Sequence, residues 1–417
     1  MKQNTYIFII IVLTFILSSC TRSQEEIREG PLNQYNNKPI KELEEETVDP
    51  IIKLIEDMDL EQKIGQLFII GFNGTSMKPW IKDMIREYYI GGFILFKDNM
   101  SSIEQTLELL NSLKEENKNN PIPLFLSIDE EGGRVHRLPK SFLNMPTAKQ
   151  IGDINNENIS FQYGKILAKR IKALGFNMDF APVMDINSNP KNPVIGDRAF
   201  GSNRDIVSHN GIQVMEGIRS ENIISVIKHF PGHGDTSIDS HWDLPIINKD
   251  IKELKELELT PFLKGIESGV EGIMIGHIMF PKIDNTYPAT LSKEIITNLL
   301  RKELSFEGVI ISDDMSMGAI AKNYTIEDAA IKYLKAGGDI LLLCHGEENP
   351  IIVMERIKEE VEKGRITEEE IDEKVYRILK LKEKYNISND TIQKIDVQSI
   401  NQDTKILLDK IKELKNQ

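Results

Sequence analysis

The sequence predicts an α/β fold, a (β/α)8 barrel of the TIM type followed by a C-terminal helical extension. Short apolar runs flanked by Gly, Asp or Pro alternate with amphipathic stretches through residues 48–387, and this alternation is typical of βα units. There are eight such runs, the number that closes a barrel of parallel strands. Each run is continuously apolar, which indicates a strand buried on both faces. An open doubly wound sheet is the alternative, but no Gly-x-Gly-x-x-Gly follows the first run, so a dinucleotide site has no support.

The predicted strands are the apolar runs, and the predicted helices are the amphipathic stretches between and after them. Strands are expected at 66–71, 92–96, 123–129, 178–185, 223–229, 272–276, 309–313 and 339–344. Helices are expected at 49–64, 103–116, 161–173, 206–220, 251–268, 293–303, 326–336, 350–363 and 368–385. The last segment, 388–417, has a weak helical period, so a docked helix and a frayed tail both remain open.

The N-terminus resembles the leader of a bacterial lipoprotein. Residues 1–19 combine Lys2, an apolar run at 6–17 and small residues, as a signal peptide does, and the run is short for a membrane span. Leu-Ser-Ser-Cys resembles the lipobox, in which the cysteine, here Cys20, is acylated. Residues 20–47 are polar and charged and predict a flexible tether. We therefore expect an extracytoplasmic protein anchored by lipid to the cell membrane; the alternative is a cleaved signal peptide with an incidental cysteine.

The charge balance and the cysteine count limit the partners. The chain of 417 residues has 51 Lys and Arg against 65 Asp and Glu, a net charge of −14. This balance argues against a nucleic-acid partner, because phosphate binding needs a basic face. Two cysteines exclude a disulfide framework, and with Cys20 acylated we expect Cys344 to be a small buried hydrophobe at a strand end. We expect a monomer that needs no metal or cofactor.

Four of the predicted strand ends carry dense polar motifs. In a barrel these ends meet at the C-terminal face, where active sites lie. A carboxylate there, facing a second acid/base group, suits attack at the anomeric carbon of a sugar. The sequence has neither the Gly-x-Ser-x-Gly elbow of serine hydrolases nor a helical His-Glu-x-x-His motif. The four motifs occupy residues 129–137, 195–201, 228–241 and 312–315.

A family resemblance sharpens this prediction. KHFPGHGDTSIDSH at 228–241 resembles the signature of the single-domain β-N-acetylhexosaminidases of glycoside hydrolase family 3, and LLRKELSFEGVIISDDMS at 299–316 resembles that family's nucleophile signature. DEEGGRVHR at 129–137 and Gly-Asp-Arg at 196–198 also match, and the likeness covers most of 50–385 in the same order. The resemblance implies a retaining exo-β-N-acetylglucosaminidase that removes terminal β-linked N-acetylglucosamine from peptidoglycan fragments.

The resemblance also implies a role for each site residue. Asp313 would be the nucleophile that forms a covalent glycosyl-enzyme, His241 the general acid/base, and Asp239 the group that orients it. A histidine with an ordinary pKa of about 6.5 can donate and accept a proton near neutral pH. Lys228 and Arg198 nearby would keep Asp313 ionised. The residues implied in binding the sugar and its substituents are Asp129, Arg137, Arg198, Lys228 and His229.

Structural roles remain open for several of these residues. A helix N-cap is the alternative role for Asp313. A metal site is the alternative for the histidines within 229–241, although Pro231 interrupts any helix there. For the glycine pair at 132–133, the alternative role is to bind a phosphate group at a helix N-terminus. We expect the glycine-rich loop after the fifth strand to be mobile and to bring His241 to the leaving oxygen when substrate binds.

Five further residues are expected to support the site rather than act in it. His233 would hold its loop, Arg134 would form an ion pair, and Asp314 would cap a helix or support its neighbour. Asp185 and His277 could either line the pocket or be buried with their hydrogen bonds satisfied, and the sequence leaves both roles open.

Two other functions stay open. One uses the same residues in a β-glucosidase-type hydrolase or in a glycoside phosphorylase, because a histidine acid/base repels phosphate less than a carboxylate does. The other is an inactive glycan-binding lipoprotein, against which the complete set of Asp239, His241 and Asp313 argues. The expected partners are β-N-acetylglucosaminide glycans and, through the lipid anchor, the membrane.

Overall fold

The structure is a computed structural model that describes residues 49–237, 239–240 and 243–416. These residues belong to one structural unit, Val48–Gln417. The predictions for the signal peptide, the tether, Cys20 and His241 lie outside the described residues. Within the described part of the chain, no helix is both long and apolar enough to cross a membrane.

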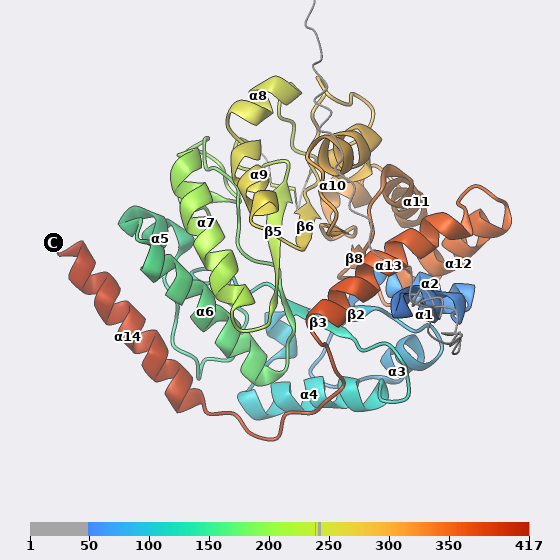
Figure 1. The fold of residues 1–417 in the computed structure, drawn as a ribbon, viewed down its shortest axis with the longest axis horizontal. Coiled ribbons are helices and arrows are strands. Elements are labelled where there is room, and N and C mark those ends of the chain that lie inside the picture. Colours follow the sequence, from blue (N-terminus) through green and yellow to red (C-terminus); the bar gives the residue numbers. More distant parts are fainter. Residues whose placement is uncertain (1–48, 238, 241–242, 417) are drawn as a thin grey trace, which may run out of the picture. The chain divides into compact units, whose positions relative to one another are not determined.

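The described residues form an eight-stranded parallel sheet in the order β7-β6-β5-β4-β3-β2-β1-β8. Strand β8 returns to pair with β1, and a bridge between Ile311 and Ile340 joins β7 to β8. The sheet is therefore a nearly closed barrel (Figure 1), which confirms the predicted fold class and rules out an open sheet. The strands are β1 (Phe68–Gly71), β2 (Gly92–Leu95), β3 (Phe125–Ile128), β4 (Met178–Asp179), β5 (Ile224–Phe230), β6 (Gly272–Ile275), β7 (Val309–Ser312) and β8 (Leu341–Leu343).

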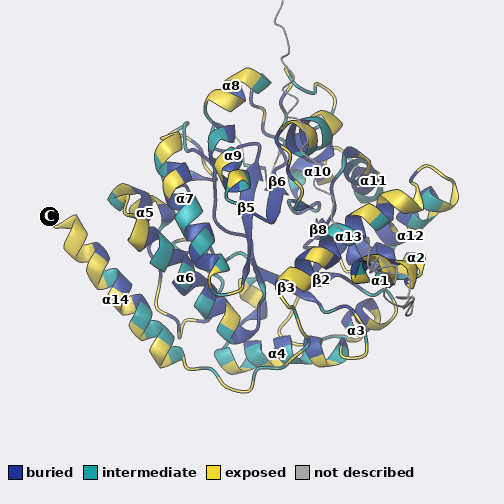
Figure 2. Cartoon of the chain, in the orientation of Figure 1, coloured by how far each residue is buried: buried dark blue, intermediate teal, exposed yellow. Residues whose placement is uncertain are grey.

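Helices surround the barrel, and each turns an apolar stripe inward while its outer face is exposed (Figure 2). The α-helices are α1 (Pro50–Glu56), α2 (Leu60–Gln66), α3 (Pro79–Arg86), α4 (Ile103–Glu116), α5 (Ala148–Ile154), α6 (Glu157–Leu174), α7 (Arg204–Arg219), α8 (Ile251–Glu256), α9 (Leu259–Glu267), α10 (Gly318–Ala321), α11 (Ile326–Ala336), α12 (Asn349–Glu362), α13 (Glu368–Lys384) and α14 (Val397–Lys415). The 3₁₀ turns are η1 (Lys97–Asn99), η2 (Gly196–Arg198) and η3 (Ala289–Leu291), and η4 (Glu294–Glu303) is a π-helix.

Two predicted helices are each divided in the structure. The stretch 49–64 forms α1 and α2, because Asp59 starts a new helix through a capping box with Gln62. The stretch 251–268 forms α8 and α9, which are separated at Leu257. The pattern of apolar residues does not predict the short helices α3 and α5.

The prediction of a fourth strand over 178–185 is wrong beyond its second residue. Strand β4 stops at Asp179, and Pro182 has no N–H with which to continue the ladder. A single bridge then pairs Val183 with Lys228. The released backbone continues to Asp185, whose side chain is buried at the active-site end of the barrel.

The floor of the barrel is closed by Lys382 of α13. Its Nζ donates to Oε1 of Gln66 at 2.8 Å and to the carbonyl oxygens of Gly91 at 2.9 Å and Pro123 at 2.7 Å. The ammonium also lies 4.5 Å from the ring centre of Phe125. Burial lowers the pKa of Lys382 well below its ordinary value, whereas the three acceptors match the three N–H donors of the charged form. One side chain thus joins the starts of three strands.

The segment left open by the sequence, 388–417, contains a docked helix. Helix α14 packs against α6, with Leu407 and Ile411 buried (Figure 1). The C-terminal extension is therefore an ordered part of the barrel's outer layer.

Candidate active site

A pocket opens at the C-terminal ends of the strands. It is lined from the ends of β2, β3, β5, β7 and β8 and from the loop that follows β4, as expected for a barrel enzyme. The structure brings Asp313 together with all five of the predicted sugar-binding residues. The polar lining consists of Asp129, Glu131, Arg137, Arg198, Lys228, His229, His233, Ser240, Asp313, Asp314 and His345.

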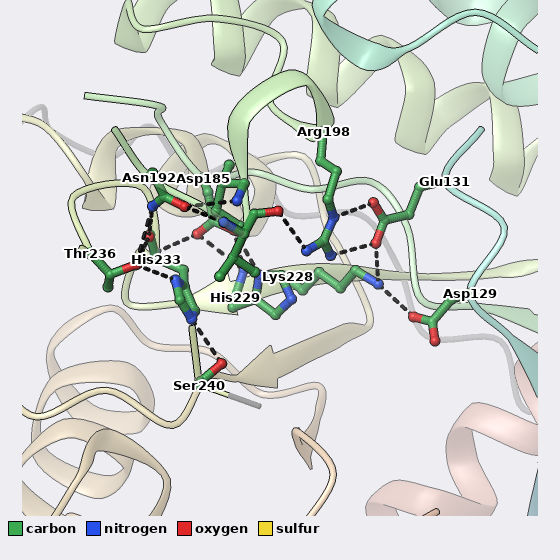
Figure 3. A network of polar contacts seen from close by, with 12 residues as sticks. Asp129, Glu131, Asp185, Asn192, Arg198, Lys228, His229, His233, Thr236 and Ser240 are labelled. Carbon is green, nitrogen blue, oxygen red and sulfur yellow. Dashed lines mark hydrogen bonds and ion pairs between the residues drawn. The ribbon is translucent and has the colours of Figure 1, made fainter. Parts of the chain in front are cut away.

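Lys228 is the centre of a buried network of charges in this pocket (Figure 3). Its Nζ lies 2.6 Å from Oδ1 of Asp129 and 2.7 Å from Oε1 of Glu131. Arg198 holds Glu131 with two bonds, from Nε at 2.8 Å and from Nη2 at 2.7 Å. Burial alone would raise the pKa of Glu131, but Arg198 and Lys228 lower it far below its ordinary value. Glu131, Arg198 and Lys228 are therefore charged, and the pairing with Lys228 fixes Asp129 as well before any ligand arrives.

One carboxylate oxygen of Asp129 accepts a hydrogen bond from Lys228, and the other faces Arg137. The distance from Arg137 Nη2 to Asp129 Oδ2 is 3.8 Å. The Arg137 guanidinium lies 5.8 Å from the ring centre of Phe96, which stacks on His345 at 5.8 Å. Asp129 can therefore accept further hydrogen bonds from hydroxyl groups, next to a rim formed by a cation and two rings.

Asp185 supports the histidine side of the pocket from below. Its Oδ2 lies 2.7 Å from Nδ1 of His229, and its Oδ1 accepts a bond from the backbone N–H of His233 at 2.6 Å. Burial raises the pKa of Asp185, but His229 and His233 lower it more, so the net shift is downward. Asp185 is thus buried with its bonding satisfied, and it fixes the ring of His229 by occupying Nδ1.

His233 holds the loop after β5, as predicted. Its Nδ1 lies 2.9 Å from Thr236 Oγ1 and its Nε2 lies 3.1 Å from Ser240 Oγ (Figure 3). Asn192 donates to the His233 carbonyl oxygen at 2.9 Å. Burial, with a smaller contribution from His229, lowers the pKa of His233 to about 4. The imidazole is therefore neutral at neutral pH and can both donate and accept within this chain of bonds.

Asp313 follows β7 and is half-buried in the pocket. Burial raises its pKa, but His229, His277 and the N–H of Asp314 lower it more, so the pKa lies below its ordinary value. Lys228 adds to this shift, as predicted, whereas Arg198 is engaged by a different carboxylate. An ionised carboxylate therefore stands at the end of a rigid strand.

The neighbouring Asp314 has a structural role. Its Oδ1 accepts bonds from the backbone N–H groups of Ser316 and Cys344, each at 3.0 Å. The next helix, α10, has Met317 as its N-cap, so the alternative of a helix cap is wrong for Asp313. Of the two adjacent carboxylates, Asp314 is thus the one that fixes the turn after β7.

Three supporting residues are also settled by their contacts. His277 is buried, with Nδ1 2.7 Å from Thr290 Oγ1 and Nε2 2.9 Å from the Asp314 carbonyl oxygen, so its burial is satisfied. Arg134 pairs with Asp197 at 2.9 Å, as predicted. The buried Cys344 follows β8, also as predicted.

The glycine pair does not precede a helix, so its alternative role as a phosphate cradle at a helix N-terminus finds no structural basis. Gly132 and Gly133 have φ angles of 81° and 56° and form a turn, which no helix follows until α5. Among the described residues, there is no group of three or more His, Cys, Asp or Glu side chains that could hold a metal ion.

The predicted acid/base pair lies in the loop after β5. Asp239 is half-buried, and its carbonyl oxygen accepts a bond from the Asp243 N–H at 3.1 Å. Its neighbour Ser240 lines the pocket. His241 lies outside the described residues.

Glu131, Ser240 and His345 are site residues to which the sequence assigns no role, and Glu131 is the charged one within the buried network. Asp129 and Glu131 point into the pocket, whereas the intervening Glu130 points behind it, with Oε1 2.7 Å from His136 Nδ1. Alternation is the rule for extended chain. Applied to the start of the motif at 129–137, this rule places Glu131 on the same side as Asp129, and it is the signal in the sequence that would have identified Glu131.

This barrel and this pocket define a class of protein: an enzyme that fixes a small polar molecule beside an ionised strand-end carboxylate. Residues 59–381 match the sequence profile of the glycosyl hydrolase family 3 N-terminal domain. The chain belongs to glycosyl hydrolase family 3.

Individual relatives agree with this assignment. The chain is 35% identical over 338 residues to beta-hexosaminidase A of Pseudoalteromonas piscicida, covering 74% of this chain and 56% of that protein, so it spans little more than half of that relative. It is 34% identical over 297 residues to the beta-hexosaminidase of Hydrogenovibrio crunogenus, covering 69% and 82% of the two chains. The family 3 β-N-acetylglucosaminidase of Paenibacillus sp. FPU-7 superposes with a TM-score of 0.79 at 35% identity, covering 84% of this chain and 68% of that one.

Proposed function

We propose that the chain is a retaining exo-β-N-acetylglucosaminidase, which removes terminal β-linked N-acetylglucosamine from peptidoglycan fragments or related glycans. The observation that carries the proposal is the position of Asp313, ionised at the end of β7 and inside a pocket of fixed charges. The names of the relatives, β-hexosaminidases and a β-N-acetylglucosaminidase at about 35% identity, support the acetamido sugar.

In this proposal Asp313 attacks the anomeric carbon and forms a glycosyl-enzyme, while His241 gives its proton to the leaving oxygen. Asp239 orients His241. In the second half, water attacks the same carbon and gives its proton to His241, so two inversions retain the β configuration. The bond between His233 and Ser240 supports this role, because it ties the loop that carries the pair to the pocket wall.

The charged network would hold the sugar. Asp129 accepts from hydroxyl groups and Lys228 donates to them. Arg137 at the rim, Arg198 and His229 would contact the sugar's substituents. Because these groups are held by each other before the sugar arrives, little reorganisation is needed at the moment of reaction.

The test is release of the aryl group from an aryl β-N-acetylglucosaminide by the full chain, beside an aryl β-glucoside, each with and without phosphate. Release from the acetamido sugar alone, reduced about 10³-fold or more in Asp313→Ala, supports the proposal. Azide should restore turnover to Asp313→Ala and give the α-glycosyl azide, because azide then replaces the missing nucleophile in one inversion. Unchanged release by Asp313→Ala refutes the assigned nucleophile.

The same assay separates the other functions. Faster turnover with phosphate and formation of a sugar 1-phosphate would show a phosphorylase. Preference for the aryl β-glucoside would show a β-glucosidase. Binding of the acetamido sugar without turnover would show a glycan-binding lipoprotein.

We further propose that the protein is extracytoplasmic and anchored through acylated Cys20. The apolar run and the lipobox-like Leu-Ser-Ser-Cys support this placement. Wild type should incorporate labelled fatty acid and sediment with membranes, whereas Cys20→Ser should lose the label. Equal labelling of both chains would overturn the anchor.

A further inference from the structure

One long loop between β3 and α5, residues 129–147, shapes the pocket. Its first part supplies Asp129, Glu131 and Arg137 to the lining. Its second part leads to α5 and alternates exposed residues, such as Ser141 and Leu143, with the buried Phe142. Loops of this length are uncommon without structure of their own, so the contacts that hold the second part determine how well the first part is placed.

Asn401 of α14 makes two directed bonds to that second part. Its Oδ1 accepts from the backbone N–H of Leu143 at 3.0 Å, and its Nδ2 donates to the carbonyl oxygen of Ser141 at 2.8 Å. A primary amide matches both partners at once because it offers an acceptor and a donor side by side. The side chain therefore binds the loop backbone as a neighbouring strand would.

Helix α14 is itself fixed, so Asn401 is a firm point of attachment. Leu407 and Ile411 are buried and α14 packs along α6 and α5 (Figure 1). Asp403 pairs with Lys169 of α6 at 2.8 Å. The segment before α14 is attached to α4 by a similar pair of bonds. Asn111 of α4 accepts from the backbone N–H of Ile392 and donates to its carbonyl oxygen.

Between the two bonded positions, Phe142 enters the interior. Its side chain is buried, and the Arg170 guanidinium lies 5.3 Å from its ring centre. Arg170, which is fully buried, pairs with Oε1 of Glu130 at 3.5 Å. The attached part of the loop is thus linked to Glu130 through the buried Arg170.

Glu130 completes the connection to the pocket. Its Oε1 lies 2.7 Å from His136 Nδ1, and its Oε2 accepts the backbone N–H of Arg137 at 2.9 Å. The guanidinium of Arg137 then faces Asp129 at 3.8 Å. A continuous series of contacts therefore runs from Asn401 of α14, through the loop and Glu130, to Arg137 in the pocket.

We propose that Asn401 is a positioning residue for substrate binding: through its two bonds, α14 holds the β3–α5 loop so that Arg137 and Asp129 face the sugar. The proposal rests on the proposed function for its choice of sugar. Helix α14 lies beyond residues 59–381, the part that matches the family profile, so the attachment is made by a segment outside that profile.

The experiment compares full-length wild type with Asn401→Ala and, as the matched control, Gln402→Ala, which changes the next, exposed position of the same helix. Alanine favours the helix, so any effect of Asn401→Ala comes from the lost bonds. Hydrogen exchange at residues 138–147 should quicken about tenfold in Asn401→Ala and stay unchanged in the control. The KM for the aryl N-acetylglucosaminide should rise about three- to tenfold with kcat within about twofold, because Asp313 lies on a different strand.

A general loss of structure would lower kcat and the melting temperature together, so the split between KM and kcat distinguishes positioning from folding. Asn401→Ser, whose side chain is too short for both partners, is a second variant expected to behave like Asn401→Ala. Unchanged exchange at 138–147, or unchanged KM beside faster exchange, overturns the proposal.

The two proposals fail in different ways. If wild type neither hydrolyses the aryl sugar nor binds N-acetylglucosamine in calorimetry, the proposed function fails, and hydrogen exchange alone still decides whether Asn401 holds the loop. If wild type is active and Asn401→Ala matches it in KM and exchange, only the positioning role fails.

Discussion

Replacing Glu131 with glutamine tests whether the charge network is as tightly coupled as its geometry implies. The side chains of Glu131 and Lys228 are 5% and 2% exposed, and that of Arg198 is 12% exposed. Glutamine keeps the shape, but it removes the charge and turns an NH₂ group toward two donors. Removing one partner from a buried ion pair costs about 3 to 5 kcal/mol, and we expect a loss of that size in the free energy of unfolding at pH 7.

The pH dependence of this loss has a defined sign. The folded-state pKa of Glu131 is lowered from 4.5, so its stabilisation is complete above that value and decreases as the pH falls. At pH 3.5 the unfolded chain binds a proton that the folded chain does not. The difference between wild type and Glu131→Gln should therefore be about 1.4 kcal/mol smaller at pH 3.5 than at pH 7.

Urea denaturation at the two pH values measures both quantities. Asp197→Asn is the control, because its ion pair with Arg134 is nearly half exposed on each side and should contribute less than about 1 kcal/mol. For the unit of about 370 residues, the loss corresponds to a melting temperature lower by about 4 to 6 °C. A loss below about 1 kcal/mol, or an equal difference at both pH values, would refute the reasoning.

Three further predictions follow from the contacts described. Lys382→Met should lower the free energy of unfolding by about 2 to 4 kcal/mol in urea titrations, because three oxygen acceptors at the barrel floor lose their donor; a neutral result would mean that water replaces it. Asp185→Asn should reduce kcat/KM for the aryl sugar about a hundredfold, because the ring of His229 loses its fixed orientation; full activity would show that His229 needs no such support. His233 should titrate near pH 4 by NMR, and because its folded pKa is lowered, its contribution to stability should be present above about pH 6.5 and decline toward pH 4 by up to about 3 kcal/mol; an ordinary titration midpoint would contradict the burial.

The sequence predicts the strands because their signal is local. A run of apolar residues buried on both faces, closed by Gly or Asp, is the same signal each time, and all eight runs form strands. The errors arise where one residue changes the backbone. The regular ladder of the fourth strand stops at Asp179, ahead of Pro182, which has no N–H to donate. Asp59 restarts a helix that periodicity alone predicts as continuous. The missed helix α5 carries a readable signal, the capping box of Thr147 and Gln150.

The sequence predicts which residues lie in the site where a motif ends a strand. It predicts less well the role of each residue, because that depends on hydrogen bonds to other parts of the chain. Position alone brings Asp313, Asp129 and Lys228 to one rim. The distinct roles of Asp313 and Asp314 depend on which one meets the backbone of the following turn. Likewise, the attachment of the loop by Asn401 joins residues that are 258 and 260 positions apart, and no local pattern contains such a contact.

The pairing inside the pocket has a consequence for how substrate arrives. The chain as a whole carries a charge of −14, but Asp129 and Glu131 are matched within the pocket by Lys228 and Arg198. Balanced pairs at contact distance produce a field that fades within a few ångströms, whereas unbalanced exposed charges act over about 10 Å at 0.1 M salt. An uncharged sugar such as the aryl N-acetylglucosaminide of the proposed assay would therefore reach this pocket by diffusion without electrostatic guidance, and added salt should leave its rate of capture almost unchanged.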